Sequence, residues 1–276
     1  YVLVCRYCWP CWWGREEAGM DKLLEVRDLS AGYQRPVVQN ISFSIRKGEL
    51  AAVLGRNGCG KTTLLRGLTG GAKVMEGTVL LDGQDCAGWD PRRKARKVAL
   101  LPQRARLLPG LLVGEVIAMG RYPWTGPLSG GDREERERVR AAAARFEVDH
   151  LLDRDCAQLS EGQRQLVQLA RLAAQDAPIL LLDEPNTALD FDNTALLFDR
   201  ITQMVEGEKC ALMVLHDPAL ALDRCHRLLL LDGGRLVDDI IVAERREEEL
   251  QAALRRLYPS IRVRREAEGR FYCLPD

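Results

Sequence analysis

GRNGCGKT, the run from Gly55 to Thr62, lies directly after a strand-like run and directly before a helix-like run. It matches the pattern G-x-x-x-x-G-K-[ST], and a strand before it and a helix after it are the context that this pattern requires. Glycines let backbone N–H groups close around phosphates, and the N-terminus of the following helix adds its dipole. We therefore predict that this part of the chain binds a nucleoside triphosphate.

The residues of this loop have distinct expected roles toward a nucleotide and a metal ion. Lys61 would reach the β- and γ-phosphates, and Thr62 would offer its hydroxyl to Mg²⁺. The residues that we expect to bind the nucleotide here are Gly55, Arg56, Asn57, Gly58, Cys59, Gly60, Lys61, Thr62 and Thr63.

A second stretch, ILLLDEP, spans residues 179–185 and ends an apolar run in two acids. Continuous apolar runs are typical of strands that are buried on both faces of a parallel sheet. A carboxylate at the end of such a strand can hold a magnesium ion, so Asp183 is a candidate metal ligand. Glu184 would activate the attacking water as a general base. The stretch is a weak signal alone, because many strands end in an acidic turn, but a strong one after a phosphate loop.

Strand-like and helix-like runs alternate along most of the chain, which predicts an α/β fold. The predicted strands are LLEVRDL, ISFSI, ELAAVLG, GTVLLDG, KVALLPQ, PILLLDEP and KCALMVLHD, with RLLLLDGGRLVDD as a closing hairpin. The predicted helices are residues 60–69, 111–119 and 132–146 and the run EGQRQLVQLARLAAQ, which Ser160 opens as N-cap. We expect a P-loop NTPase core with a mainly parallel sheet, an antiparallel β subdomain and an inserted helical subdomain at about 104–170.

Composition limits the class of protein. The chain has 276 residues, of which 46% are hydrophobic and 29% are charged, as in ordinary globular proteins. Lys plus Arg and Asp plus Glu number 40 each, and this neutral balance argues against a broad nucleic-acid footprint. No apolar run reaches the roughly 18 residues that a membrane span needs. The cysteines after residue 20 lie singly, which indicates reduced thiols in a reducing compartment.

The chain opens YVLVCRYCWPCWW, and this opening is expected to lie outside the folded domain. Its three cysteines have the spacing of an iron–sulfur run, but Arg15 stands where the fourth ligand is needed. Zinc also lacks a fourth ligand, because the first histidine is His150. We therefore interpret residues 1–19 as a non-native or disordered leader, with metal binding as the weaker alternative. The domain itself is predicted at 20–243. A tail at 244–276, with a charged helix near 244–257 and two short strands, is expected to pack on it.

LSEGQ, residues 159–163, stands directly before a predicted helix. Alone it has a simple explanation, in which Ser160 caps the helix and Gly162 is incidental. With the two motifs above, however, the chain resembles the nucleotide-binding subunit of the ATP-binding cassette (ABC) family over nearly all of residues 22–240. LSEGQ is similar to the family's signature sequence, with Glu161 where glycine is commonest.

Four further positions resemble motifs of that family and occur in its order. They are Tyr33 in AGYQRPVV, similar to the aromatic that stacks on adenine; Gln103 in LLPQ, similar to the glutamine loop; Asp190 in NTALD, similar to the D-loop; and His216 in VLHD, similar to the switch histidine. Each match is weak alone, because a single Tyr or His is more often structural. All of them together, in the right order, make another function improbable.

The resemblance implies a mechanism in which two cassettes face each other head to tail and enclose two ATP molecules with Mg²⁺. Ser160, Gly162 and Gln163 of one copy would bind the ATP that the phosphate loop of the other copy holds. Glu161 would add negative charge near the phosphate and slow closure of the dimer slightly.

The resemblance also implies roles for the remaining positions. Gln103 would contact Mg²⁺ and the attacking water while it senses a membrane partner. His216 would hold the γ-phosphate and position Glu184, and Asp190 would link the two sites. The expected partners are a second cassette, a polytopic permease and, indirectly, a substrate-binding protein, at the cytoplasmic face of the membrane. No nucleic acid is expected.

Several longer stretches are similar to the importers of iron chelates, haem and cobalamin within this family. They are AMGRYPWTGPLSGGDRE, LLDRDCAQLSEGQRQLVQLAR, LHDPALALDRCHRLLLLDGGR and the ending LYPSIRVRREAEGRFYCLPD. A soluble ABC-type ATPase that acts on nucleic acid or the translation machinery is the main alternative, but such proteins usually carry two cassettes or a long coiled coil. A small-molecule kinase would leave LSEGQ, NTALD and His216 unexplained.

Overall fold

The computed structural model describes residues 22–103, 110–125, 133–187, 189–266 and 271–275. The predicted leader at residues 1–19, with its three cysteines, lies outside the described residues. So does Ala188 within NTALD. No helix in the described part of the chain has the length and apolar character needed to cross a bilayer.

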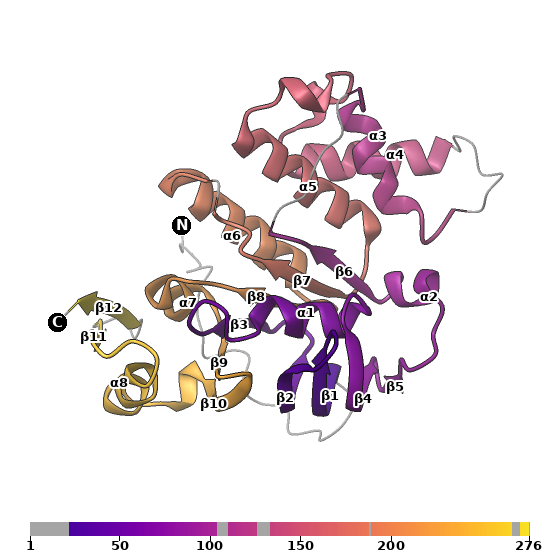
Figure 1. Ribbon diagram of the computed structural model, residues 1–276. Coiled ribbons are helices and arrows are strands. Elements are labelled where there is room, and N and C mark those ends of the chain that lie inside the picture. Colours follow the sequence, from indigo (N-terminus) through magenta and orange to yellow (C-terminus); the bar gives the residue numbers. More distant parts are fainter. Residues whose placement is uncertain (1–21, 104–109, 126–132, 188, 267–270, 276) are drawn as a thin grey trace.

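A six-stranded sheet forms the centre of the molecule, in the order β10-β9-β3-β8-β7-β6 (Figure 1). Its strands are β3 Leu50–Leu54, β6 Val98–Leu101, β7 Ile179–Asp183, β8 Cys210–Val214, β9 Arg227–Asp232 and β10 Arg235–Ile241. All neighbours pair in parallel except β9 and β10, which form the predicted closing hairpin. Every residue of β3, β7 and β8 is buried, as the continuous apolar runs indicated. The predicted mainly parallel sheet is therefore confirmed.

A second, antiparallel sheet has the order β2-β1-β4-β5. Its strands are β1 Lys22–Gly32, β2 Pro36–Arg46, β4 Lys73–Leu81 and β5 Gln84–Asp85. Helix α1, Lys61–Thr69, shares a hydrophobic cluster with both sheets through Leu64, Leu65 and Leu68. This packing fixes the helix that follows the phosphate loop.

Three helices gather in the upper part of Figure 1, and one of them, α5, contacts β6 at the edge of the central sheet. They are α3 Val113–Ala118, α4 Arg133–Arg145 and α5 Glu161–Gln175, and we call them the helical lobe. The bounds of α5 match the predicted run. Its N-cap is Ser160, whose side chain accepts the N–H of Gln163, as the sequence predicted.

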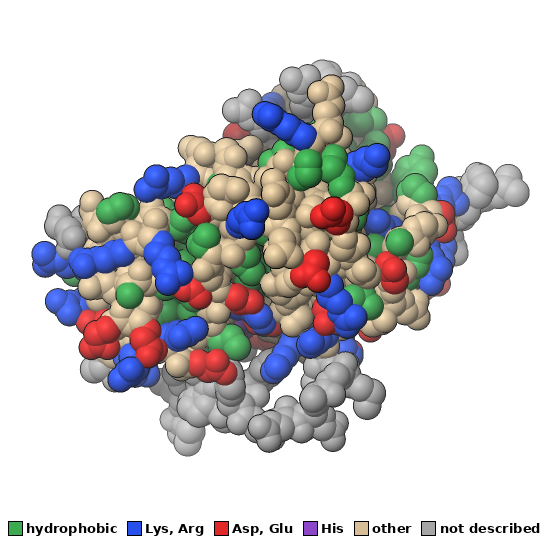
Figure 2. Space-filling model, turned by 60° about the horizontal axis from the view of Figure 1, so that its bottom comes forward, with side chains coloured by type: hydrophobic (Ala, Val, Ile, Leu, Met, Phe, Trp, Pro, Cys, Tyr) green, Lys and Arg blue, Asp and Glu red, His purple; other side chains and the backbone are tan. Residues whose placement is uncertain are grey.

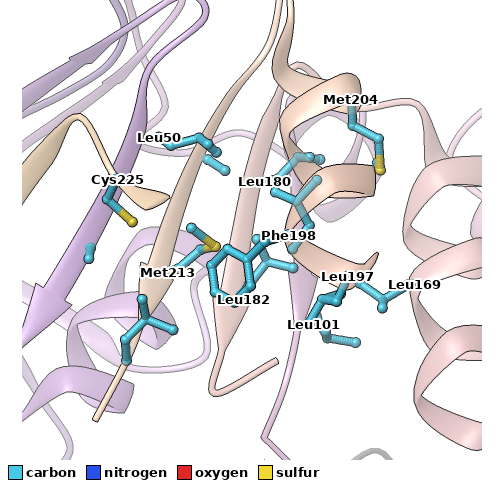
Figure 3. Packing of buried hydrophobic residues seen from close by; sticks show 14 of the residues in the cluster. Leu50, Leu101, Leu169, Leu180, Leu182, Leu197, Phe198, Met204, Met213 and Cys225 are labelled. Carbon is cyan, nitrogen blue, oxygen red and sulfur yellow. The ribbon is translucent and has the colours of Figure 1, made fainter. Parts of the chain in front are cut away.

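Three other helices were not predicted: α2 Pro91–Ala95, α6 Phe191–Val205 and α7 Pro218–Arg224. Each begins after an aspartate whose side chain accepts a backbone N–H of the first turn, and α2 and α7 also begin with proline. Helix α6 covers the central sheet, where Phe198 packs among Leu182, Met213 and neighbouring side chains (Figure 3). Short 3₁₀ turns occur at Met119–Arg121, Asp149–Leu151, Cys156–Gln158 and Val242–Glu244.

The end of the chain folds back onto the central domain. It forms α8 Glu247–Arg255, β11 Ile261–Arg265 and β12 Phe271–Pro275. Leu250, Leu254 and Val263 belong to the same hydrophobic cluster as the central sheet, and β12 packs on α7. Burial of each such side chain stabilises the fold by roughly 1.5–3 kcal/mol.

Charged side chains of both signs are interspersed over the face that Figure 2 presents. This distribution agrees with the neutral balance of 40 basic and 40 acidic residues. The cysteines within the described residues are free.

Candidate nucleotide-binding site

The phosphate loop connects the end of β3 to the start of α1. Gly58 and Gly60 have φ of 80° and 108°, a left-handed conformation that favours glycine. A Cβ on Gly60 would also lie 2.6 Å from Cγ1 of Val38. The loop can therefore keep its tight course into α1 only with glycine at this position.

Lys61 is buried although it carries a charge. Its Nζ donates to the carbonyl oxygens of Gly55, at 2.7 Å, and Arg56, at 3.2 Å. These bonds hold the ammonium group against the loop that is expected to receive phosphates. They also offset part of the free-energy cost of burying the Lys61 ammonium group.

The three predicted metal ligands, Thr62, Gln103 and Asp183, line one pocket of about 190 Å³. The Asp183 side chain is 3% exposed, and its Oδ1 has no hydrogen-bond partner among the described residues. Burial raises the pKa of Asp183, while a hydrogen bond from the Thr62 hydroxyl opposes that shift. Hydroxyl, amide and carboxylate oxygens suit Mg²⁺, so this orphaned buried oxygen fits the ion.

Glu184 follows β7 and lies where three side chains converge on its carboxylate. Gln103 Nε2 donates to Oε2 at 2.7 Å, Thr187 Oγ1 donates to Oε2 at 3.2 Å, and His216 Nε2 pairs with Oε1. Burial raises the pKa of Glu184, but the bonds from His216 and Gln103 outweigh burial and leave this pKa below its usual value. The structure therefore brings all three predicted catalytic residues together.

The backbone of Glu184 is unusual for a residue with a long side chain. Its φ is 52°, in the left-handed region that such residues seldom adopt. Its N–H donates to the carbonyl of Val214 on the neighbouring strand at 3.1 Å. Such local strain is often found at functional sites and is maintained by the surrounding packing.

Tyr33 lies in the turn between β1 and β2 and is 50% exposed. Its hydroxyl accepts a hydrogen bond from Arg66 of α1 at 2.9 Å. The ring is thus attached to the helix that follows the phosphate loop while it remains open to solvent.

The signature residues lie at the start of α5, in the helical lobe, and none of them lines the pocket described above. Ser160 and Gln163 form a reciprocal capping box, with N···O distances of 3.2 and 3.1 Å. Glu161 pairs with Arg164 at 3.1 Å, so the charge expected to slow dimer closure has a neighbouring cation. Gly162 is partly exposed at the same end of the helix.

Asp190 begins α6, where its side chain accepts the N–H of Asn193 at 2.9 Å. A Cβ on Gly162 would lie 3.7 Å from the side chain of Leu189, so the D-loop touches the signature. Gln165 Nε2 also donates to the carbonyl of Pro185 at 2.7 Å. Asp190 thus follows a segment that contacts the signature helix, and it does not line the pocket.

Among the described residues, three polar side chains form hydrogen bonds in or beside the site that the sequence did not predict: Arg66, Gln165 and Thr187. Arg66 and Gln165 are polar residues on amphipathic helices, where an ordinary solvated position is the usual explanation. Thr187 lies inside the quoted NTALD motif, so its proximity to Glu184 was the one signal available.

A family profile described as "ABC transporter" matches residues 38–187 of this chain. The matched segment contains the phosphate loop, the glutamine loop, the signature and the Asp183–Glu184 pair. The chain belongs to the ABC transporter family. It is the ATP-binding and ATP-hydrolysing part of such a transporter, and the predicted family is confirmed.

The relatives of this ABC cassette include importer subunits. The hemin import ATP-binding protein HmuV of Pseudomonas fluorescens is 39% identical over 209 residues, which cover 74% of this chain and 80% of the relative. The petrobactin import ATP-binding protein FpuD of Bacillus anthracis is 35% identical over 233 residues, 84% of each chain. The predicted resemblance to iron-chelate and haem importers is therefore confirmed.

Solved structures agree with the fold of the cassette. A protein described as a metal-chelate type ABC transporter in an inward-facing conformation matches 93% of this chain and 98% of its own, with a TM-score of 0.77 and 24% identity. A dimeric ATP-binding cassette in a post-hydrolysis state, bound to ADP and phosphate, has a TM-score of 0.71 and 25% identity. It covers 79% of this chain and 98% of its own.

Proposed function

We propose that two copies of this chain bind and hydrolyse MgATP in the site described above and thereby power the import of an iron-chelate or haem-type cargo. The observation that carries the proposal is the arrangement around Glu184. Its carboxylate accepts hydrogen bonds from Gln103 and Thr187 and pairs with His216. The preceding residue, Asp183, has an oxygen without a hydrogen-bond partner among the described residues, and it lines the pocket together with Thr62.

The residues suggest how the site performs hydrolysis. A bound Mg²⁺, held by Thr62, Asp183 and Gln103, would neutralise charge on the β- and γ-phosphates. Glu184, ionised because its pKa is lowered, accepts a proton from the attacking water. The water oxygen bonds to the γ-phosphorus as the bond to the bridging oxygen breaks, which gives ADP and phosphate. His216 keeps the carboxylate in place.

The phosphate loop and the signature have separate places in one copy, which supports a two-copy arrangement. Lys61 and Thr62 would hold the ATP, and Ser160, Gly162 and Gln163 of the second copy would contact its γ-phosphate. The N-terminus of α5 would contribute its dipole there. Asp190, beside the signature, would link the two sites.

The cargo and the membrane partner are inferred from the relatives and from exposed apolar side chains. HmuV and FpuD are named for hemin and petrobactin import. Leu112, Met119, Tyr122 and Trp124, in and next to the helical lobe, are exposed and would suit docking to a polytopic permease. The cassette would then work at the cytoplasmic face of the membrane, and a substrate-binding protein would deliver the cargo to the permease.

Two substitutions test the ATPase assignment. Lys61→Ala should lower the rate of ATP hydrolysis at least about 100-fold, because the charge that binds the β- and γ-phosphates is lost. Glu184→Gln should lower the rate to a similar extent but keep ATP binding, because the amide cannot accept the proton. The measurement is phosphate release together with nucleotide binding. Hydrolysis at the parental rate by Glu184→Gln would show that Glu184 is not the base.

The importer assignment needs its own experiment. The tagged chain would be recovered from detergent-solubilised membranes of the source cell, and its partners identified by mass spectrometry. Recovery of a polytopic permease would support it, and uptake of haem and iron chelates through that permease would then be measured. Reproducible recovery of only soluble or nucleic-acid partners would favour the soluble ABC-type ATPase instead.

A further inference from the structure

A hydrogen bond connects two parts of the site that lie far apart in the sequence. Arg66 Nη1, from the last turn of α1, donates to the Tyr33 hydroxyl at 2.9 Å, across 33 positions of the chain. Tyr33 lies in the turn between β1 and β2 of the antiparallel sheet, whereas Arg66 belongs to the helix that begins at the phosphate loop. The bond therefore ties the aromatic side chain to the phosphate-binding element directly.

The position of Arg66 on α1 follows from helix geometry. Residues four apart lie on the same face of a helix, so Arg66 lies one turn beyond Thr62 on the side facing the pocket. Both residues line the pocket that contains Asp183, where burial raises the pKa of Asp183 and the positive charge of Arg66 partly opposes that rise. Arg66 thus faces both the phosphate end of the site and Tyr33.

The backbone of Arg66 is held in place by the turn that ends α1. Ala72 N–H donates to the Arg66 carbonyl at 3.1 Å, and Thr69 Oγ1 donates to the same oxygen at 3.2 Å. A Cβ on Gly71 would lie 3.5 Å from Cβ and Cγ of Arg66, so the chain passes close to the stem. The fixed backbone sets the point from which the Arg66 side chain reaches the Tyr33 hydroxyl.

The Tyr33 ring combines a restrained hydroxyl with an open surface. Half of the residue is exposed although its oxygen is hydrogen-bonded. A ring that is held in its bound orientation before the ligand arrives loses less conformational entropy when a base stacks on it. A free tyrosine in the same turn would lose that entropy on binding.

We propose that Arg66 is a positioning residue for the nucleotide base: its hydrogen bond to Tyr33 holds the ring in the orientation on which the base stacks. The inference rests on the proposed function, in which Tyr33 stacks on the adenine of ATP. Arg66 acts through Tyr33 and does not touch the reacting atoms. The alternative is that Arg66 only stabilises α1, as a cation near the C-terminus of a helix does, and the experiment must separate the two roles.

The test compares two single variants and their combination. Arg66→Met keeps the length of the stem and removes the donor, whereas Tyr33→Phe keeps the ring and removes the acceptor. Each should raise KM for ATP roughly threefold to tenfold, the factor for one hydrogen bond, with kcat changed less than about twofold. The double variant should be no worse than either single variant, because both remove the same bond. Arg27→Gln, an exposed arginine on β1, serves as the matched control.

The outcomes separate this inference from the proposed function. If Tyr33→Ala leaves KM for ATP unchanged, then Tyr33 does not stack on the base and that part of the proposed function fails. If Tyr33→Ala raises KM but Arg66→Met and Tyr33→Phe do not, the positioning role of Arg66 alone is overturned. Additive effects in the double variant would overturn it as well. So would a shift in the magnesium concentration for half-maximal hydrolysis without a change in KM for ATP, because Arg66 would then act through Asp183.

Discussion

Two neighbouring acids at the end of β7 have opposite electrostatic environments. Burial raises the pKa of Asp183, and its Oδ1 has no hydrogen-bond partner among the described residues. Glu184 is also subject to burial, but His216 and Gln103 leave its pKa lowered. Asp183 thus has an unpartnered oxygen among the described residues for the expected cation, and the lowered pKa of Glu184 favours the carboxylate form that the proposed general base requires. A single peptide bond separates the two residues, and Asp183 ends β7 whereas Glu184 follows the strand with a left-handed backbone, φ 52°.

Asp183→Asn should stabilise the nucleotide-free protein by about 1 kcal/mol at pH 7, because it removes a buried charge with an unsatisfied oxygen. The folded-state pKa of Asp183 is raised, so the penalty is present above the folded pKa and disappears as the pH falls below the unfolded value. The difference in unfolding free energy between variant and parent should therefore shrink as the pH falls from 7 toward 4. Urea unfolding at several pH values measures it.

The same variant should lose ATP hydrolysis at least about 100-fold, because the amide carries no charge for the magnesium ion. Asp192→Asn, an exposed acid in the first turn of α6, serves as the control for removal of one negative charge. For the stability prediction, an Asp183→Asn variant that is less stable than the parent at pH 7 would show that the neighbours of Asp183 stabilise its charge in the folded state.

The turn after α3 joins the helical lobe to the edge of the central sheet. Arg121 is bonded to Glu135 of α4 at 2.6 and 3.1 Å and to the carbonyl of Ala174 at 2.8 Å. Trp124 Nε1 donates to the carbonyl of Gln175 at 2.7 Å, and Gln175 in turn donates to the carbonyls of Ala95 and Val98. The MGRYPW stretch therefore holds the end of α5 through hydrogen bonds, while Tyr122 remains exposed.

Gly120→Ala should disrupt the packing of this turn against α5. A Cβ at Gly120 would lie 2.2 Å from the carbonyl oxygen of Arg171 on α5, so the turn and the helix would have to separate. We expect the free energy of unfolding to fall by about 1–3 kcal/mol, as for overpacked sites in protein cores. Ala118→Ser, at an exposed position in α3, should change it by less than about 0.5 kcal/mol. Unchanged stability in Gly120→Ala would show that the helices can adjust freely.

The whole molecule separates the two sets of residues that are expected to bind the phosphates of one ATP. The phosphate loop lies between the two sheets, and the signature lies in the helical lobe and does not line the same pocket. One copy therefore presents two incomplete halves of the proposed site. A head-to-tail pair would place each half against its complement.

An isosteric pair of substitutions at Ser160 tests this arrangement in the Glu184→Gln background. Asn and Asp are both good N-caps, so each should preserve α5. Ser160→Asp places a carboxylate where the γ-phosphate is expected and should abolish the ATP-dependent dimer, whereas Ser160→Asn should retain at least part of it. Light scattering after size exclusion, with and without ATP, measures the dimer. Equal dimerisation of the Asp variant and its parent would contradict the proposed role of Ser160.

Features whose physical signals are local can be predicted from the sequence alone. A phosphate loop is recognisable because its glycines, lysine and threonine must follow one another between a strand and a helix. The bounds of α5 could be predicted because Ser160 caps the helix and the run after it keeps helical periodicity to Gln175. Strand β7 could be predicted because its apolar run is continuous. Helix α6 shows the limit, because its cap, Asp190, is predicted only as part of the D-loop motif and not as the start of a helix.

The tertiary structure decided which polar groups meet. Gln103 and Glu184 are 81 positions apart, His216 and Glu184 are 32 apart, and Arg66 and Tyr33 are 33 apart. The family resemblance predicted that Gln103, Glu184 and His216 act together, but no residue pattern paired Arg66 with Tyr33. Hydrogen bonds of this kind depend on how the two sheets and the helices pack, and many distant residues set that packing. Periodicity and spacing report only on neighbours along the chain, so they do not contain this information.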